Sequence, residues 1–194
     1  MNCKITKSVI EPFMSFGKMP IANGFLKKDE FKKEFFFEME VGFSEKCSLF
    51  QLKDHPTPKQ MFNDKYPFFT GSSETMKLHF KKYSEFLKKN YIKNNSKIIE
   101  IGSNDGTFLS NFKNSNLEYT GFEPSGNVAK LANNNGIKTI NSYFGTETLN
   151  HVKNFVSQTD VIFAANVICH IPDLVDLIKA IDKLLSKNGV FIFE

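Results

Sequence analysis

The sequence predicts an α/β domain with a parallel sheet of the nucleotide-binding type in its second half. From residue 97 onward, five short apolar runs alternate with four segments of helical character. This alternation is the pattern of a parallel sheet with right-handed helical crossovers. A loop with two glycines follows the first run, and an acidic residue follows the second. Both features fall where open parallel sheets bind ligands, at the carboxyl ends of strands.

Each expected strand is a short apolar run bounded by polar residues, and each expected helix follows one of these runs. The strands are expected at KIIEI (97–101), LEYTGF (117–122), GIKTI (136–140), DVIFAAN (160–166) and GVFIFE (189–194). The helices between them are expected to begin near Asp105, Ser125, Thr146 and Pro172.

The first half of the chain is organised differently. Residues 1–55 carry prolines and glycines between short apolar stretches such as FFFEMEVGF, which predicts a small β-rich module held together by its phenylalanines. Residues 56–96 are expected to form a connector, or a loop that covers a site, and then an amphipathic helix that begins at Ser73 and Glu74. The apolar positions of that helix are Met76, Phe80, Tyr83, Leu87 and Tyr91. We therefore expect domains at 1–55, 56–96 and 97–194.

Composition excludes several classes of protein. All 25 basic residues are lysines, and a protein without arginine is a poor candidate for a sequence-specific reader of nucleic acid. Residues 1–95 carry 17 lysines against 11 acidic residues and the remainder 8 against 10, which indicates different roles for the two halves. The absence of a long apolar run or an apolar leader predicts a cytoplasmic protein without a membrane partner. Three cysteines, an odd number, predict no disulfide framework.

The loop after the first expected strand reads EIGSNDGTFL, with glycines at 102 and 106. Glycines at these places allow a sharp turn and let a ligand lie against the backbone. The spacing is neither the G-x-G-x-x-G of dinucleotide enzymes nor a P-loop. Glu123, about twenty positions further on at the end of the second expected strand, could accept both hydroxyls of a ribose and would repel a 2′-phosphate.

These segments resemble the motifs of class I S-adenosylmethionine-dependent methyltransferases. The resemblance rests on EIGSNDGTFL, GFEPS, NSYF and NVICHIPDL in this order. The upstream segments SFGKMPIANGFL, KCSLFQL and YPFFTGSSETMKLHFKKY are similar to the sugar C-methyltransferases that act on nucleotide-linked keto-deoxysugars. The resemblance implies a Rossmann-like class I methyltransferase sheet with five of its seven strands present, preceded by a zinc-ribbon-like module.

The resemblance also implies a cofactor, S-adenosylmethionine, and the residues that hold it. Glu123 would hold the ribose, and Asn166 would lie beneath the methionine portion. The methionine end would be lined by Glu100, Gly102, Ser103, Asn104 and Gly106, and the adenine would be bordered by Asn141, Ser142 and Tyr143.

Three side chains are candidates for proton transfer. C-methylation beside a ketone requires removal of a proton from carbon, and the imidazole of His170 has a suitable pKa range. Alternatively, His170 caps the helix that begins near Pro172. Tyr66 and His79 match family positions that face the substrate, and the alternative for both is core packing.

The sequence departs from the family at both ends. The zinc module of the family has two C-x-x-C pairs, whereas here Thr6 follows Cys3 and Ser44 precedes Cys47, so we expect zinc to be absent or weakly bound. The C-terminal half of the family has no counterpart after Glu194, which predicts an open sheet edge and possible self-association or a partner chain.

Three functions therefore stay open. The first is C-methylation of a nucleotide-activated deoxysugar in surface glycan biosynthesis. The second is O-methylation of a sugar or small metabolite. The third is an inactive fragment that needs a partner half.

Overall fold

The computed structural model describes residues 1–194, and the chain divides into two compact units. The first unit is Met1–Met61 with Pro172–Leu174, and the second is Phe62–Ile171 with Val175–Glu194. The division falls after Met61, so the amphipathic helix expected in 56–96 lies in the same unit as the parallel sheet. No helix is both long enough and apolar enough to cross a membrane.

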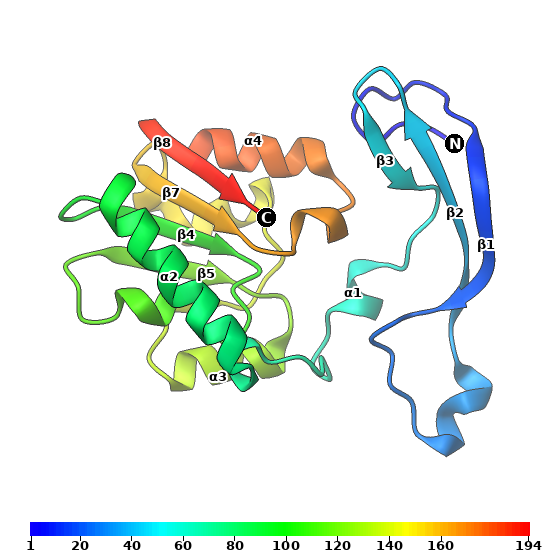
Figure 1. The fold of residues 1–194 in the computed structure, drawn as a ribbon, viewed down its shortest axis with the longest axis horizontal. Coiled ribbons are helices and arrows are strands. Elements are labelled where there is room, and N and C mark those ends of the chain that lie inside the picture. The colour runs from blue at the N-terminus through cyan, green and yellow to red at the C-terminus, as the bar shows by residue number, and fades with distance from the viewer. The chain divides into compact units, whose positions relative to one another are not determined.

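The second unit is built on a five-stranded parallel sheet (Figure 1). Its strands are β4 (Lys97–Ile101), β5 (Glu118–Phe122), β6 (Thr139–Ile140), β7 (Thr159–Ala164) and β8 (Leu185–Phe193). They lie in the order β6-β5-β4-β7-β8. The predicted α/β fold with five parallel strands is confirmed. The strand β8 begins four residues before the expected Gly189, because Leu185 already pairs with Thr159 across an irregularity.

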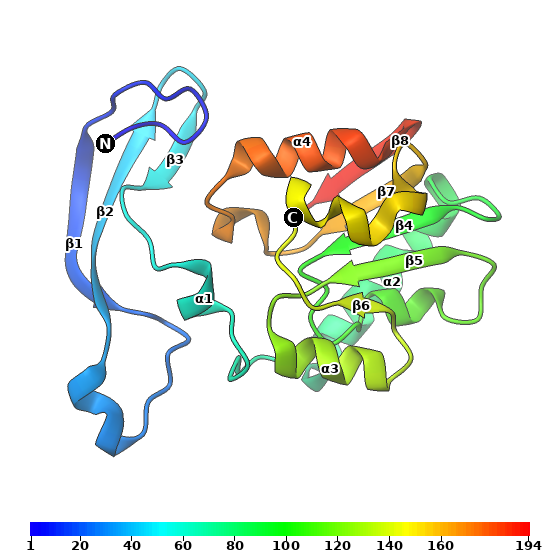
Figure 2. The same ribbon diagram turned by 180° about the vertical axis from the view of Figure 1, so that it is seen from behind.

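Helices cover both faces of this sheet (Figures 1 and 2). Helix α2 (Glu74–Asn90) crosses one face, and the 3-10 helix η4 (Thr146–Phe155) and α4 (Leu174–Leu184) lie on the other. The remaining helix of the unit, α3 (Gly126–Asn134), connects β5 to β6. Ser73 caps α2 as predicted, because its Oγ accepts a hydrogen bond of 3.3 Å from the amide of Met76.

An aromatic core lies between α2 and the sheet. Phe80 and Leu87 on α2 are buried with Ile98 of β4 and Phe163 of β7. The ring of Phe108 packs on Phe163 with centroids 4.2 Å apart. Burial of each such side chain stabilises the fold by about 1.5–3 kcal/mol. This core therefore holds α2 against β4 and β7.

Two of the four expected helices form 3-10 turns in place of an α-helix. The helix expected near Asp105 is only the short 3-10 helix η3 (Leu109–Phe112). Asp105 Oδ1 accepts hydrogen bonds from the amide and hydroxyl of Thr107, and this local turn replaces the first helical turn. The segment near Thr146 forms 3-10 turns with a kink at Val152, where φ is −133°. The helix expected near Pro172 begins at Leu174.

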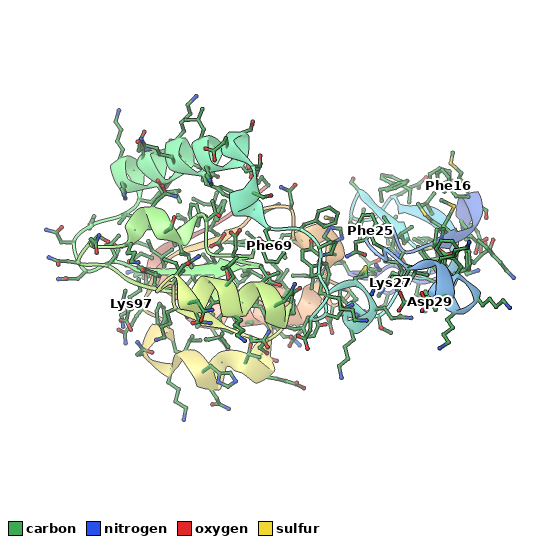
Figure 3. The ribbon with its side chains drawn as sticks, turned by 90° about the horizontal axis from the view of Figure 1, so that it is seen from below. Phe16, Phe25, Lys27, Asp29, Phe69 and Lys97 are labelled. Carbon is green, nitrogen blue, oxygen red and sulfur yellow. The ribbon has the colours of Figure 1, made fainter.

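The first unit is a small antiparallel module with strands in the order β1-β2-β3. Its elements are β1 (Pro12–Pro20), η1 (Lys28–Lys33), β2 (Phe36–Ser44), β3 (Leu49–Leu52) and the short helix α1 (Pro58–Met61). The β-rich prediction is confirmed, but the expected phenylalanine cluster is wrong. Phe16, labelled in Figure 3, is 52% exposed, and Phe50 is 60% exposed. The apolar residues buried in the module are Cys3, Ile10 and Val41.

Candidate functional site

The carboxyl ends of the parallel strands lie along one edge of the sheet, and the loops that follow them form the candidate site (Figure 1). The glycine loop follows β4, Glu123 follows β5, Asn141 follows β6, and Asn166 and His170 follow β7. Lys97 begins β4 at the opposite edge, and Figure 3 shows it well apart from Phe69, which lies beside the glycine loop. The topology therefore brings these loop residues, which come from four different strands, to one edge of the sheet.

The glycine loop has a conformation that only glycine adopts easily. Gly102 has φ +68°, and a Cβ there would lie 2.4 Å from Cγ2 of Val167. Gly106 has φ +79°, and a Cβ there would lie 2.8 Å from Cγ2 of Ile137. Both positions therefore need glycine for its backbone freedom and for its lack of a side chain.

Glu123 holds this loop against the end of β5. Its carboxylate is 5% exposed and accepts hydrogen bonds from the amide of Asn104 at 3.0 Å and of Ser125 at 2.7 Å. Burial raises the pKa of Glu123, and these amide hydrogen bonds oppose that effect. A carboxylate has about four lone-pair positions, so two acceptor positions remain for a ligand.

Glu100 is a buried acid without a partner. It is 3% exposed, and its Oε2 accepts no hydrogen bond. Burial, followed by the charges of Glu123 and Asp105, raises the pKa of Glu100 well above its ordinary value. A buried polar atom without a partner is costly, so this arrangement suits a ligand that brings a donor or a positive charge.

Residues 62–71 lie against the glycine loop, which agrees with the interpretation that the connector covers a site. Asn104 Oδ1 accepts a hydrogen bond of 2.8 Å from the amide of Thr70, and Asn104 Nδ2 donates one of 3.2 Å to the carbonyl of Phe68. Oδ2 of Asp105 accepts a bond of 2.7 Å from the amide of Gly71. Asp105 carries no sequence signal for this role beyond its place between the two glycines.

The residues after β6 organise the same area. Asn141 donates from Nδ2 to the carbonyls of Glu123 at 2.9 Å and Pro124 at 3.0 Å. Ser142 donates to the carbonyl of Tyr143, and the hydroxyl of Tyr143 donates a bond of 3.0 Å to the carbonyl of Phe62. These three residues are therefore occupied in positioning the loops around Glu123.

Phe62 brings together two of the three proton-transfer candidates. Its ring contacts Tyr66 at a centroid distance of 5.6 Å and His170 at 5.8 Å. Burial and the charge of Glu123 raise the pKa of Tyr66, and burial lowers the pKa of His170.

His79 lies in a separate cluster. Its Nε2 is 3.0 Å from Oε1 of Glu194, and its ring stacks on Tyr83 at 5.9 Å. The carbonyl of Glu194 accepts a hydrogen bond of 2.8 Å from the amide of Asn166, which has φ +54°. The sequence analysis did not place Glu194 beside Asn166, because only the parallel pairing of β7 and β8 brings the two residues together.

The parallel strand order, the glycine loop after β4 and the buried Glu123 after β5 place the second unit among the nucleotide-binding α/β domains. A family model described as "Methyltransferase domain" matches residues 74–194, and the chain belongs to this family. A second model, described as "Putative zinc binding domain", matches residues 3–62.

Similar proteins agree with this assignment. The C-methyltransferase NovU of Streptomyces niveus is 25% identical over 183 residues, which cover 93% of this chain and 43% of NovU. This chain therefore spans less than half the length of that curated relative.

Two solved structures share the fold. One is described as a "putative S-adenosyl-L-methionine-dependent methyltransferase" of Methanococcus maripaludis, with a TM-score of 0.51 and 14% identity over 66% of this chain and 64% of that chain. The other is a SAM-dependent methyltransferase of Leishmania major, with a TM-score of 0.51 and 17% identity over 63% of this chain and 52% of that chain.

The residues of the first unit do not fit a structural zinc site. Such a site takes four Cys or His ligands in a tetrahedron. The Sγ atoms of Cys3 and Cys47 are 3.6 Å apart, but hydroxyl residues Thr6 and Ser44 stand where two further thiols are needed. No group of three or more His, Cys, Asp or Glu side chains could hold a metal ion.

Proposed function

We propose that this chain binds S-adenosylmethionine and takes part in C-methylation of a nucleotide-activated keto-deoxysugar in surface glycan biosynthesis. The observation that carries the cofactor assignment is the pair of buried carboxylates, Glu100 and Glu123, beneath the glycine loop. The similarity to NovU, a C-methyltransferase, supports transfer to carbon.

The residues at the site fit the cofactor. The free acceptor atom of Glu100 suits the ammonium group of the methionine end, and Glu123 suits two ribose hydroxyls. Gly102 and Gly106 let the backbone approach the ligand closely, with Ser103 and Asn104 beside them. Asn141, Ser142 and Tyr143 would border the adenine, and Asn166 would lie beneath the methionine portion. When bound, S-adenosylmethionine supplies an electrophilic methyl group on a sulfonium.

The chain's own residues would manage the proton on the substrate. His170 is the first candidate to remove the proton from the carbon beside the ketone, since its lowered pKa keeps the imidazole neutral at pH 7. Tyr66 shares the contact with Phe62 and could donate a hydrogen bond to the developing enolate oxygen. His79, paired with Glu194, is a second candidate for the base.

The first experiment is calorimetric titration of the purified chain with S-adenosylmethionine and S-adenosylhomocysteine. We expect micromolar binding that Glu123→Ala abolishes and Glu147→Ala leaves unchanged, because Glu147 is an exposed carboxylate on the same unit. A folded chain that binds neither compound would contradict the proposal.

O-methylation is the alternative activity, since the same cofactor site serves both. Base-catalysed attack from carbon exchanges a substrate α-hydrogen for deuterium in heavy water, and His170→Ala should slow that exchange. Methyl transfer without exchange would favour the O-methyltransferase. The third possibility, an inactive fragment that needs a partner half, predicts cofactor binding without turnover until a partner chain is added.

A further inference from the structure

We propose that Cys3 and Cys47 form a reversible disulfide when the chain meets a low-molecular-weight disulfide such as oxidised glutathione. The two Sγ atoms lie 3.6 Å apart although the residues are 44 positions apart in the sequence. Cys3 is fully buried, and Cys47 is partly exposed in the turn between β2 and β3. The fold therefore places one partly exposed thiol beside a buried one.

Contacts that do not involve sulfur hold the segment around Cys3 against β3, the strand that directly follows the turn with Cys47. The amide of Lys4 donates a hydrogen bond of 3.0 Å to Oε1 of Gln51, and Nε2 of Gln51 donates one of 3.1 Å to the carbonyl of Asn2. Gln51 is 6% exposed, so these bonds are shielded from water. The thiols are thus held near each other by the backbone around them.

The remaining movement is small. A disulfide bond is about 2.05 Å long, so the sulfur atoms need to approach by about 1.5 Å. The hydrogen bonds that the two sulfur atoms make are weak. The amide of Thr6 donates one of 3.3 Å to Sγ of Cys3, and Sγ of Cys47 donates one of 3.4 Å to Oγ of Ser44. Side-chain rotation and a slight shift of either turn can supply the approach.

The chemistry balances with one molecule of oxidised glutathione. The thiolate of Cys47 attacks a glutathione sulfur, which breaks that disulfide, forms a mixed disulfide and releases one reduced glutathione. The sulfur of Cys3 then attacks Sγ of Cys47, which forms the Cys3–Cys47 bond and releases the second glutathione. Two thiol hydrogens leave on two glutathiones, and a reductant reverses both steps.

The test uses the full chain with Cys169→Ser, so that only Cys3 and Cys47 remain. After equilibration with oxidised glutathione, we expect loss of both free thiols. A tryptic digest without reductant should contain the peptide 1–4 joined to the peptide 47–53. Dithiothreitol should restore both thiols. Two free thiols after equilibration, or zinc bound in a 1:1 ratio to the purified chain, would overturn the proposal.

Single variants separate the two steps. With Cys3→Ser the reaction should stop at a glutathione adduct on Cys47, and with Cys47→Ser the buried Cys3 should stay unmodified. If either variant fails to fold, the oxidised and reduced forms of the Cys169→Ser chain are compared instead. We expect oxidation to raise the unfolding midpoint of the first unit by on the order of 10 °C, because the bond closes a long loop in the unfolded chain. An unchanged midpoint together with free thiols would contradict the pairing.

Discussion

The backbone amide of Asn104 donates a hydrogen bond of 3.0 Å to Oε2 of Glu123, and this bond joins the glycine loop after β4 to the end of β5. The other oxygen of Glu123 accepts from the amide of Ser125, at the start of α3. One buried carboxylate thus fixes two loops, so the site depends on its charge and on its position.

Gly102→Ala should destabilise the second unit by about 2–4 kcal/mol, because an L-residue at φ +68° is strained and the new methyl would collide with Val167. Urea unfolding measures the loss. Gly136→Ala is the matched control, since Gly136 has φ +75° but its Cβ would meet only the flexible end of Lys113. Equal losses in the two variants would show that the contact with Val167 costs nothing.

Glu100 should make the folded chain less stable as the pH rises. Its pKa is raised on folding, so the folded state holds its proton more tightly than the unfolded state does. This contribution is complete below the ordinary pKa of 4.5 and is lost as the pH rises toward the folded pKa, with a slope of up to about 1.4 kcal/mol per pH unit. Glu100→Gln should flatten the curve of unfolding free energy against pH, and a curve unchanged in that window would exclude the effect.

Cofactor binding should release protons from the carboxylates beneath the loop. A cation beside Glu100 favours the charged form of the acid and lowers the raised pKa. The heat of S-adenosylmethionine binding should therefore change with the ionisation enthalpy of the buffer at one pH. Glu100→Gln should remove most of that dependence, whereas the surface variant Glu147→Ala should keep it. Binding heats that are the same in every buffer would contradict proton release.

Asp105→Ala should loosen residues 62–71 from the glycine loop. The variant loses the 2.7 Å bond from the amide of Gly71 and the hydrogen bonds to Thr107. Each such bond contributes about 1 kcal/mol or more, so tryptic cleavage after the exposed Lys65 should become roughly tenfold faster. Asp182→Ala, which removes an exposed carboxylate from α4, serves as the control. A rate equal to that of the control would mean that other contacts hold the segment.

Local patterns were sufficient to predict the strands, α2 and the glycine loop. The spacing of Met76, Phe80 and Leu87 is that of a helix, and the apolar run KIIEI is typical of a buried strand. The helix expected to begin near Asp105 does not form, because hydrogen bonds between the side chain of Asp105 and Thr107 compete with those of a first helical turn. The prediction that a phenylalanine cluster holds the first unit together was also wrong, because the number of phenylalanines does not show which face of a strand each one occupies.

The fold class and the positions of Gly102, Glu100 and Glu123 could be predicted from the amino-acid sequence, because strand periodicity and turn chemistry are properties of neighbouring residues. Three contacts could be seen only in the folded chain: Asp105 anchors residues 62–71, Glu194 lies beside His79, and Sγ of Cys3 lies 3.6 Å from Sγ of Cys47. These pairs are separated by between 34 and 115 positions in the chain. Contacts at such separations depend on how the strands pair and how the helices pack around them, which no local pattern encodes.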